Sequence, residues 1–204
     1  MIKKIIISFL LVLGVTSSFA NASAVSAAVT EEITLAELQL ELMETADPET
    51  LEAMDRLDEY LIIDSDGESV FDLTSAVEND ESDLLIEIGK VFNQFGEESK
   101  SNDGMMSMAA AASSGWPRIP IYGNYCGPAG PGGTDFTKKP IDNLDDACRY
   151  HDRCYLPGGS DNVINRSCNL AFMKRLLPVI QTSNKLTRKH ITAVAAYKYF
   201  AGRL

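Results

Sequence analysis

The chain has 204 residues and a formal net charge of -11 at pH 7, which argues against a nucleic-acid partner. The charge is divided unevenly along the chain. Residues 30–104 carry 23 acidic and 3 basic side chains, whereas residues 105–204 carry 6 acidic and 13 basic ones. Two regions of opposite sign indicate separate roles.

We expect residues 1–27 to be a secretory signal peptide. Residues 1–4 are basic, residues 5–15 are apolar and small residues follow, which is the three-part layout of such peptides. The apolar run is shorter than the about 20 residues that a membrane-spanning helix needs. Several small-residue cleavage sites fit within residues 20–27. The protein is therefore predicted to be secreted to the extracellular space, with an uncleaved N-terminal anchor as the alternative.

Residues 28–104 form the acidic region, for which the pattern predicts three helices. A capping box, Thr34-Leu35-Ala36-Glu37, opens a helix that ends near Thr45. The pair Asp47-Pro48 is a typical start for a second helix, and a third is expected over residues 83–95. Both carry an apolar stripe that we expect to be a core or docking face. The stripes are Leu51, Met54, Leu57 and Leu61 in the second helix and Leu84, Leu85, Ile88, Val91 and Phe92 in the third.

The second half of the chain begins after a linker. Residues 96–115 are rich in Gly, Ser and Met, and we place the linker proper at residues 105–115, followed by a domain of residues 116–204. That domain opens with a Pro- and Gly-rich loop over residues 116–133. Helices are expected from Asp142 through Tyr155, from Asp161 or Asn162 to a kink or end at Pro178, and from Leu186 to Phe200.

The last predicted helix, residues 186–200, is basic on one side and apolar on the other. Its basic side can bind anionic lipid head groups or simply face water. His190 is expected to be a surface residue without a role. The basic residues are Lys185, Arg188, Lys189 and Lys198.

Four cysteines all lie in the second half of the chain. In an oxidising compartment an even number of cysteines predicts two disulfides. Cys148 can bond back to Cys126 in the glycine-rich loop, and Cys154 can bond forward to Cys168 on the following helix. The alternative is a zinc site with His151, but no Cys-x-x-Cys spacing supports it.

A His-Asp pair on the helix over residues 142–155 carries the chemistry. Residues three and four apart share a helix face, so Cys148, His151, Asp152 and Tyr155 cluster there. A histidine can act as the general base for water. The carboxylate of Asp152 and the carbonyls of the loop are the oxygen ligands that calcium prefers, and a glycine N–H of the loop can complete an oxyanion site. These residues indicate a calcium-dependent esterase.

Two segments together resemble the secreted phospholipase A2 family. Tyr122-Gly123-x-Tyr125-Cys126-Gly127 is similar to its calcium loop, and Asp145-x-Ala147-Cys148-x-x-His151-Asp152-x-Cys154-Tyr155 is similar to its active-site helix. The resemblance covers residues 116–180. It implies an all-α fold with a core of two antiparallel disulfide-linked helices and a calcium loop. It also implies hydrolysis of the sn-2 acyl ester of glycerophospholipids, with Ca²⁺ as cofactor, at a membrane surface that we expect to be anionic.

The resemblance gives each matching residue a role. His151 is the base that activates water, Tyr155 supports the hydrogen-bond network behind it, and the Gly127 N–H lies in the oxyanion hole. The core disulfides are Cys126–Cys148 and Cys154–Cys168. The calcium ligands are carbonyls of Tyr125, Gly127 and Ala129 and the carboxylate of Asp152.

Three features depart from the family pattern. Ala129 stands where the third loop ligand is usually a glycine, and Asn169 stands where a carboxylate usually orients the histidine. An amide can still fix the histidine tautomer, but it stabilises the imidazolium less than a charge does. Four cysteines are few for the family and suggest a minimal, bacterial-type or plant-like member. The alternative to an enzyme is a non-catalytic, phospholipase-like membrane-binding or toxin-like module.

The acidic region is predicted to be a propeptide or regulatory region. Its charge is opposite to that of residues 105–204, so it can cover a basic membrane-binding face and inhibit the enzyme intramolecularly until it is cut away. An accessory helical domain without an inhibitory role is the alternative.

Overall fold

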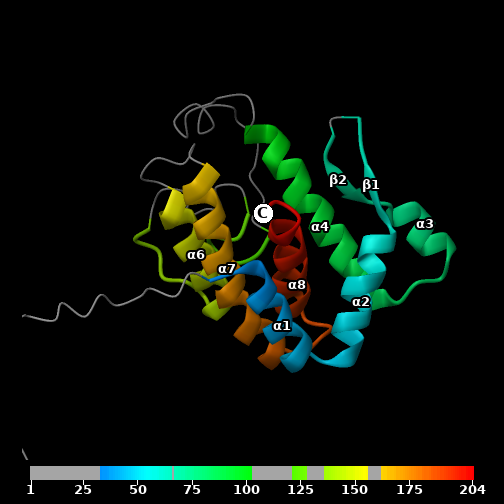
Figure 1. Cartoon of the computed structure of the whole chain (residues 1–204), viewed down its shortest axis with the longest axis horizontal. Coiled ribbons are helices and arrows are strands. Elements are labelled where there is room, and N and C mark those ends of the chain that lie inside the picture. Colours follow the sequence, from blue (N-terminus) through cyan, green and yellow to red (C-terminus); the bar gives the residue numbers. More distant parts are fainter. Residues whose placement is uncertain (1–32, 66, 103–120, 128–135, 156–161) are drawn as a thin grey trace, which may run out of the picture. The chain divides into compact units, whose positions relative to one another are not determined.

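Helices account for most of the described chain, which comprises residues 33–65, 67–102, 121–127, 136–155 and 162–204 of the computed structural model (Figure 1). The predicted all-α fold class is confirmed. The expected signal peptide, the linker at 105–115 and Ala129 lie outside the described residues. Within the described part of the chain, no helix has both the length and the apolarity to cross a membrane.

The elements follow the predicted order with additions. The acidic region contains α1 (Leu35–Thr45), α2 (Pro48–Glu59), β1 (Leu61–Ile63), β2 (Ser69–Phe71), α3 (Leu73–Glu78) and α4 (Asp83–Asn102). The second half contains α6 (Asn143–Tyr155), α7 (Asn162–Thr182) and α8 (Arg188–Ala201). The antiparallel pair β1–β2 and the short α3 are not predicted by the sequence pattern, because segments this short show no clear periodicity.

Three helix ends differ from the expectation. Helix α2 ends at Glu59, so Leu61, expected on its apolar stripe, lies in β1. Helix α4 continues past residue 95 to Asn102, into residues expected to be linker. Helix α7 continues past Pro178 to Thr182. Pro178 is exposed, so water can serve the carbonyl that its missing N–H leaves unpaired.

The helix starts of the acidic region are fixed by local hydrogen bonds. The Thr34 hydroxyl accepts from the Glu37 N–H at 3.2 Å, and the Glu37 carboxylate accepts from the Thr34 N–H at 2.9 Å, which confirms the capping box. Asp47 accepts from the Thr50 N–H at 3.1 Å, with Pro48 as the first helical residue. These contacts are local in sequence, which is why the pattern predicts them.

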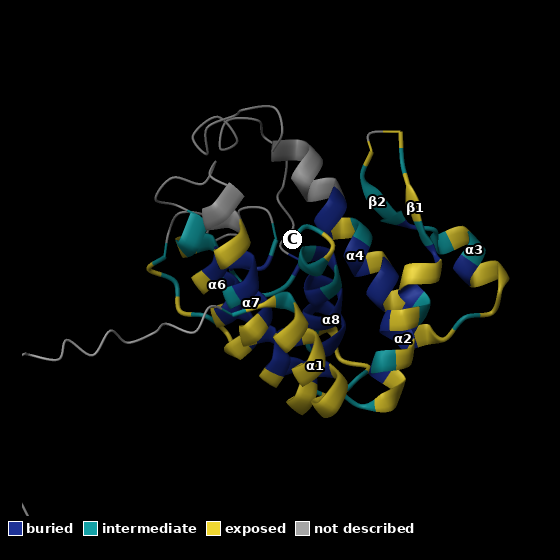
Figure 2. Ribbon diagram, viewed as in Figure 1, coloured by how far each residue is buried: buried dark blue, intermediate teal, exposed yellow. Residues whose placement is uncertain are grey.

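Helix α8 is the centre of the packing. It packs against α4, α7 and α2, while α6 packs along α7 and α1 also contacts α7. Nine of its 14 residues are buried, many more than the single stripe that a surface helix buries, and Figure 2 shows most of α8 as buried. The helix therefore joins the acidic region to the second half of the chain.

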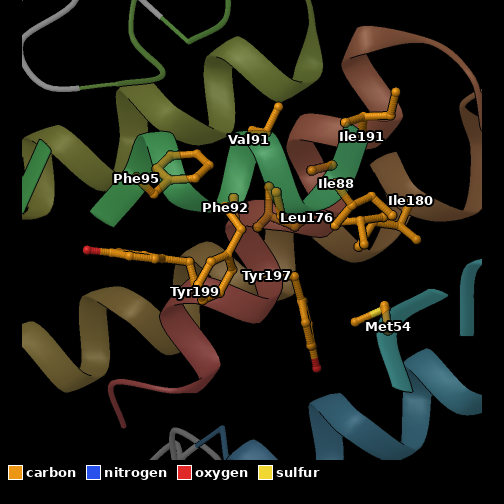
Figure 3. Packing of buried hydrophobic residues seen from close by; sticks show 14 of the residues in the cluster. Met54, Ile88, Val91, Phe92, Phe95, Leu176, Ile180, Ile191, Tyr197 and Tyr199 are labelled. Carbon is orange, nitrogen blue, oxygen red and sulfur yellow. The ribbon is translucent and has the colours of Figure 1, made fainter. Parts of the chain in front are cut away.

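The apolar stripe of α4 forms much of this shared core. Figure 3 shows Phe92 and Phe95 of α4 near Tyr199 of α8. The ring of Tyr199 lies 5.6 Å from those of both Phe92 and Phe95. Burying a side chain of this kind contributes roughly 1.5–3 kcal/mol. The stripe is thus a core face, as its spacing predicts.

The expectation that His190 is a surface residue is wrong. His190 is completely buried near the start of α8. Its Nε2 lies 3.0 Å from the Thr50 hydroxyl of α2, and its Nδ1 lies 3.1 Å from the Ser183 hydroxyl. Burial lowers the pKa of this histidine, so it is a neutral bridge between α2 and α8.

A close approach at Gly89 allows the hairpin to pack on α4. A Cβ at Gly89 would lie 2.1 Å from the buried ring of Phe71 in β2, whereas a Cβ at Gly96 of the same helix would have its nearest neighbour at 4.0 Å. Only the first position is closed to a larger residue.

We expect Gly89→Ala to lower the free energy of unfolding by about 1–3 kcal/mol, because the new methyl group displaces Phe71. Gly96→Ala is the matched control and should be neutral or stabilising by up to about 1 kcal/mol, because alanine favours the helix. Urea unfolding followed by circular dichroism measures both. Equal stability of the two variants would contradict the packing described for Gly89.

Candidate active site

The loop before α6 is held by one buried carboxylate, that of Asp145. Its Oδ1 accepts from the N–H groups of Asn124 and Tyr125, both at 2.8 Å, and its Oδ2 accepts from the Ile141 N–H at 2.9 Å. Asp145 is completely buried, and these three donors replace the water that an ionised carboxylate loses on burial. The motif includes Asp145, but sequence reasoning assigns it no role; its place in the first turn of the helix is the signal that was available.

Two glycines of this loop have backbone conformations that require glycine. Gly123 has a φ of 59°, and a Cβ there would lie 2.4 Å from the Asp145 carboxylate carbon. Gly127 has a φ of 116°, which L side chains rarely adopt. The glycines of the loop motif are therefore explained by the close approach to Asp145 and by the turn after Cys126.

Two disulfides connect the loop, α6 and α7. Cys126 bonds to Cys148, with 5.0 Å between their Cα atoms, and Cys154 bonds to Cys168, with 5.8 Å. Both predicted pairings are confirmed, and the zinc alternative is wrong because all four cysteines are in disulfides. Both bonds end on α6, on either side of His151 in sequence.

His151 is buried and its tautomer is set by Asn169 of α7. The His151 Nε2 lies 2.9 Å from the Asn169 Oδ1, which also accepts from the Tyr155 hydroxyl at 2.7 Å. An amide oxygen can only accept, so Nε2 carries the proton and Nδ1 carries the lone pair. No described residue bonds to Nδ1, which is the nitrogen available to a water molecule. The structure brings together His151, Tyr155 and Asn169 as expected.

Three aromatic rings enclose the imidazole. Phe172 stacks on it with 4.4 Å between ring centroids, and Tyr155 and Phe200 each meet it edge-on at 4.7 Å. Burial lowers the pKa of His151 to about 4, although the hydrogen bond to Asn169 acts in the opposite direction. Sequence reasoning missed Phe172 and Phe200 as site residues, because both lie on helices where an apolar side chain is unexceptional.

Asp152 is the carboxylate best suited to a cation. It is half-buried, and among the described residues it has no hydrogen-bond or ion-pair partner. Burial raises its pKa to about 8, and the negative charge of Asp145 contributes. A cation beside Asp152 would offset both effects.

Further ligands beside this carboxylate would have to be backbone carbonyls of the loop that the Cys126–Cys148 disulfide joins to α6. Cys126 uses its own N–H and carbonyl in a bridge with Tyr122, at 3.2 Å each way, and the carbonyl of Gly127 lies outside that bridge. The described residues contain no group of three or more His, Cys, Asp or Glu side chains able to hold a metal. A metal here would therefore depend on one carboxylate and backbone oxygens, a donor set that fits calcium.

Relatives of the chain are found among snake phospholipase A2 chains. The basic phospholipase A2 beta-bungarotoxin A-AL2 chain of Bungarus multicinctus is 38 % identical over 82 residues, or 40 % of this chain and 48 % of the relative. The acidic phospholipase A2 beta-bungarotoxin A chain of Bungarus candidus is 38 % identical over 82 residues, or 40 % of this chain and 47 % of its own length. The acidic phospholipase A2 homolog taipoxin gamma chain of Oxyuranus scutellatus scutellatus is 50 % identical over 38 residues, 19 % of this chain and 21 % of the relative.

The chain spans about half the length of the first two of these relatives. No family model matches the chain, and no solved structure matches it. The matched relatives, the helical fold and the two disulfides agree with the resemblance seen in the sequence. The chain is distantly related to phospholipase A2 chains.

Proposed function

We propose that the chain is a secreted, calcium-dependent phospholipase A2. It hydrolyses the sn-2 acyl ester of glycerophospholipids to a free fatty acid and a lysophospholipid. The observation that carries the proposal is the pair on α6: a buried His151 with its lone pair on Nδ1, next to an Asp152 without a partner among the described residues. The distant relationship to phospholipase A2 chains supports the same reaction class.

In the proposed mechanism, His151 is the general base. Its Nδ1 takes a proton from water while the water oxygen forms a bond to the sn-2 carbonyl carbon. Asn169, held by Tyr155, keeps the proton of the neutral ring on Nε2. The Gly127 N–H donates to the carbonyl oxygen as that oxygen becomes negative. When the bond to the glycerol oxygen breaks, the imidazolium returns its proton to that oxygen.

The residues that would hold Ca²⁺ are Asp152 through its carboxylate and Tyr125, Gly127 and Ala129 through their carbonyls. A calcium ion held by these groups would supply positive charge to stabilise the oxygen that becomes negative in the reaction. The lowered pKa of His151 keeps the ring neutral at pH 7 and able to accept a proton. Because Asn169 is uncharged, it stabilises the imidazolium less than a carboxylate would, and we expect a slower reaction as a result.

Secretion and subtype belong to the same proposal. The layout of residues 1–27 supports export, which fits the two disulfides. The count of four cysteines is what suggests a bacterial-type or plant-like member, whereas the relatives named above are all snake proteins.

A second candidate is a phospholipase-like module that binds or disrupts membranes without hydrolysis. It is favoured by the neutral Asn169 behind the histidine and by a relative whose name is that of a phospholipase A2 homolog. In that case His151 and Asp152 would be structural residues of the disulfide-linked frame.

We further propose that the acidic region, as a propeptide or regulatory region, inhibits binding to anionic membranes by charge. Its acidic side chains pair with bases at and near α8. Lys198 is 2.6 Å from Asp58, Lys185 pairs with Asp47 and Glu49, and Arg203 pairs with Glu68. Such pairs at or near the surface add little stability, but they occupy cations that would otherwise attract anionic lipid.

The test of the reaction is fatty-acid release from phospholipid vesicles, with calcium or with a chelator. We expect release that needs calcium and that falls by about 10²–10⁴-fold in His151→Gln, because the base is lost. Asp152→Asn should abolish the response to calcium. Fatty-acid release that is unchanged by the chelator and by His151→Gln would rule out the proposed enzyme mechanism. Leakage of vesicle contents without hydrolysis would support the second candidate.

We expect Asn169→Asp to raise the pKa of His151 above about 4, by roughly 1–3 units, because a carboxylate on Nε2 stabilises the imidazolium. The acid limb of the pH–rate profile should move to higher pH by the same amount. Nuclear magnetic resonance of the ring protons measures the titration, with His190 as an internal control. An unchanged His151 pKa would contradict the hydrogen bond to Asn169.

The masking proposal is tested by neutralising the paired acids in the full chain. The triple variant Glu49→Gln, Asp58→Asn, Glu68→Gln frees Lys198 and Arg203 and leaves Lys185 with Asp47 as its remaining partner. It should bind phosphatidylglycerol vesicles up to roughly 30-fold more tightly, at about 1 kcal/mol for each freed cation. The matched control Glu44→Gln, Glu52→Gln, Asp55→Asn changes the net charge equally, but the three acids have no ion pair with a described residue. Equal binding by the two triple variants would rule out masking.

A further inference from the structure

The imidazole of His151 needs more than its hydrogen bond to be held in place. Its Cβ attachment and its Nε2 bond to Asn169 fix two points of the ring, and the ring can still tilt about the line between them. Such a tilt swings Nδ1, the atom that must meet water. Phe172, stacked on the ring, and Phe200, in a T-shaped contact with it, block this motion.

Phe200 lies in the last turn of α8. It lies one residue before the end of α8 at Ala201, and it is only half-buried. Terminal helical turns are the part of a helix that frays. Contacts from outside α8 are therefore needed to keep this ring against His151.

Phe172 of α7 supplies one such contact, with 5.3 Å between its ring and that of Phe200, and the acidic region supplies others. The Phe95 ring of α4 lies 6.2 Å from the Phe200 ring in an edge-on arrangement, and Phe95 and Phe92 both pack on the adjacent Tyr199. Arg203, just beyond α8, lies over the Tyr199 ring at 3.6 Å and pairs with Glu68. Side chains of α4 thus reach His151 through Phe200.

We propose that Phe200 is a positioning residue for His151 and that Phe95 of α4 holds Phe200 in place. The acidic region then acts on the membrane-facing cations by charge and on the histidine by packing. The catalytic part of this inference rests on the proposed function, whereas the packing part does not.

Nuclear magnetic resonance of the full chain tests the packing directly. The chain has two histidines, so the ring protons of His151 and His190 can be assigned with one His190→Gln variant. A neighbouring aromatic ring shifts these resonances. We expect Phe200→Leu and Phe95→Leu both to move the His151 resonances and to leave those of His190 unchanged, which also shows that the variants are folded.

Phe92→Leu is the matched control, because Phe92 lies on the same helix and contacts Tyr199. It should move the His151 resonances less than Phe95→Leu does, because Phe92 reaches Phe200 through Tyr199 rather than directly. If Phe95→Leu leaves the His151 resonances unchanged, or if Phe92→Leu shifts them equally, then Phe95 does not hold His151 in place through Phe200.

Kinetics test the positioning role. Phe200→Leu and Phe95→Leu should lower kcat by about 10–100-fold with little change in KM, because the base is misplaced rather than the substrate site. Phe200→Tyr keeps the ring and should restore most of kcat. An unchanged kcat in Phe200→Leu would overturn the role. If the wild type does not hydrolyse phospholipid, the proposed function fails, and the resonance shifts still decide the packing.

Discussion

The site depends on the burial of one charge, the Asp145 carboxylate. Out of water, this group is stable only because three backbone N–H groups of the preceding chain turn toward it, and that requirement fixes the path of the loop. The same charge disfavours ionisation of Asp152, since nearby carboxylates resist being charged together. Loop geometry and the demand for a cation therefore have a common origin. A divalent ion beside Asp152 would offset the negative charge of Asp145, the same charge that fixes the path of the loop.

The division of charge along the sequence does not correspond to a division in packing. Acidic and basic regions share a core around α8, and residues 33–204 form one unit. Opposite charges at the rim and apolar side chains at the centre both favour this association. If the acidic region is cut off after α4 and leaves, two things would therefore change together. Cations at the surface would be freed, and Phe200 would lose its support from α4. The balance between them would decide whether cleavage activates or inactivates the protein.

Local signals made part of this structure predictable. The capping box at Thr34 and the apolar stripe of α4 follow from neighbours a few residues away, and the spacing around His151 is enough to indicate a site. What the sequence does not reveal depends on contacts between distant residues. His190 is buried by a partner 140 residues away, and Phe200 meets His151 only because α8 packs beside α7. Neither contact produces a periodic pattern in the sequence from which it could be predicted.

Both disulfides end on α6, so the helix that carries His151 and Asp152 is tied to its loop and to α7 only after oxidation. In a reducing cytoplasm neither bond forms, and the loop is held to α6 without its covalent link. For a proposed lipase this order of events has a protective consequence. In the secreted enzyme proposed above, the covalent links of the site would form only in the oxidising space beyond the membrane, after the chain has passed the lipids of the cell that makes it.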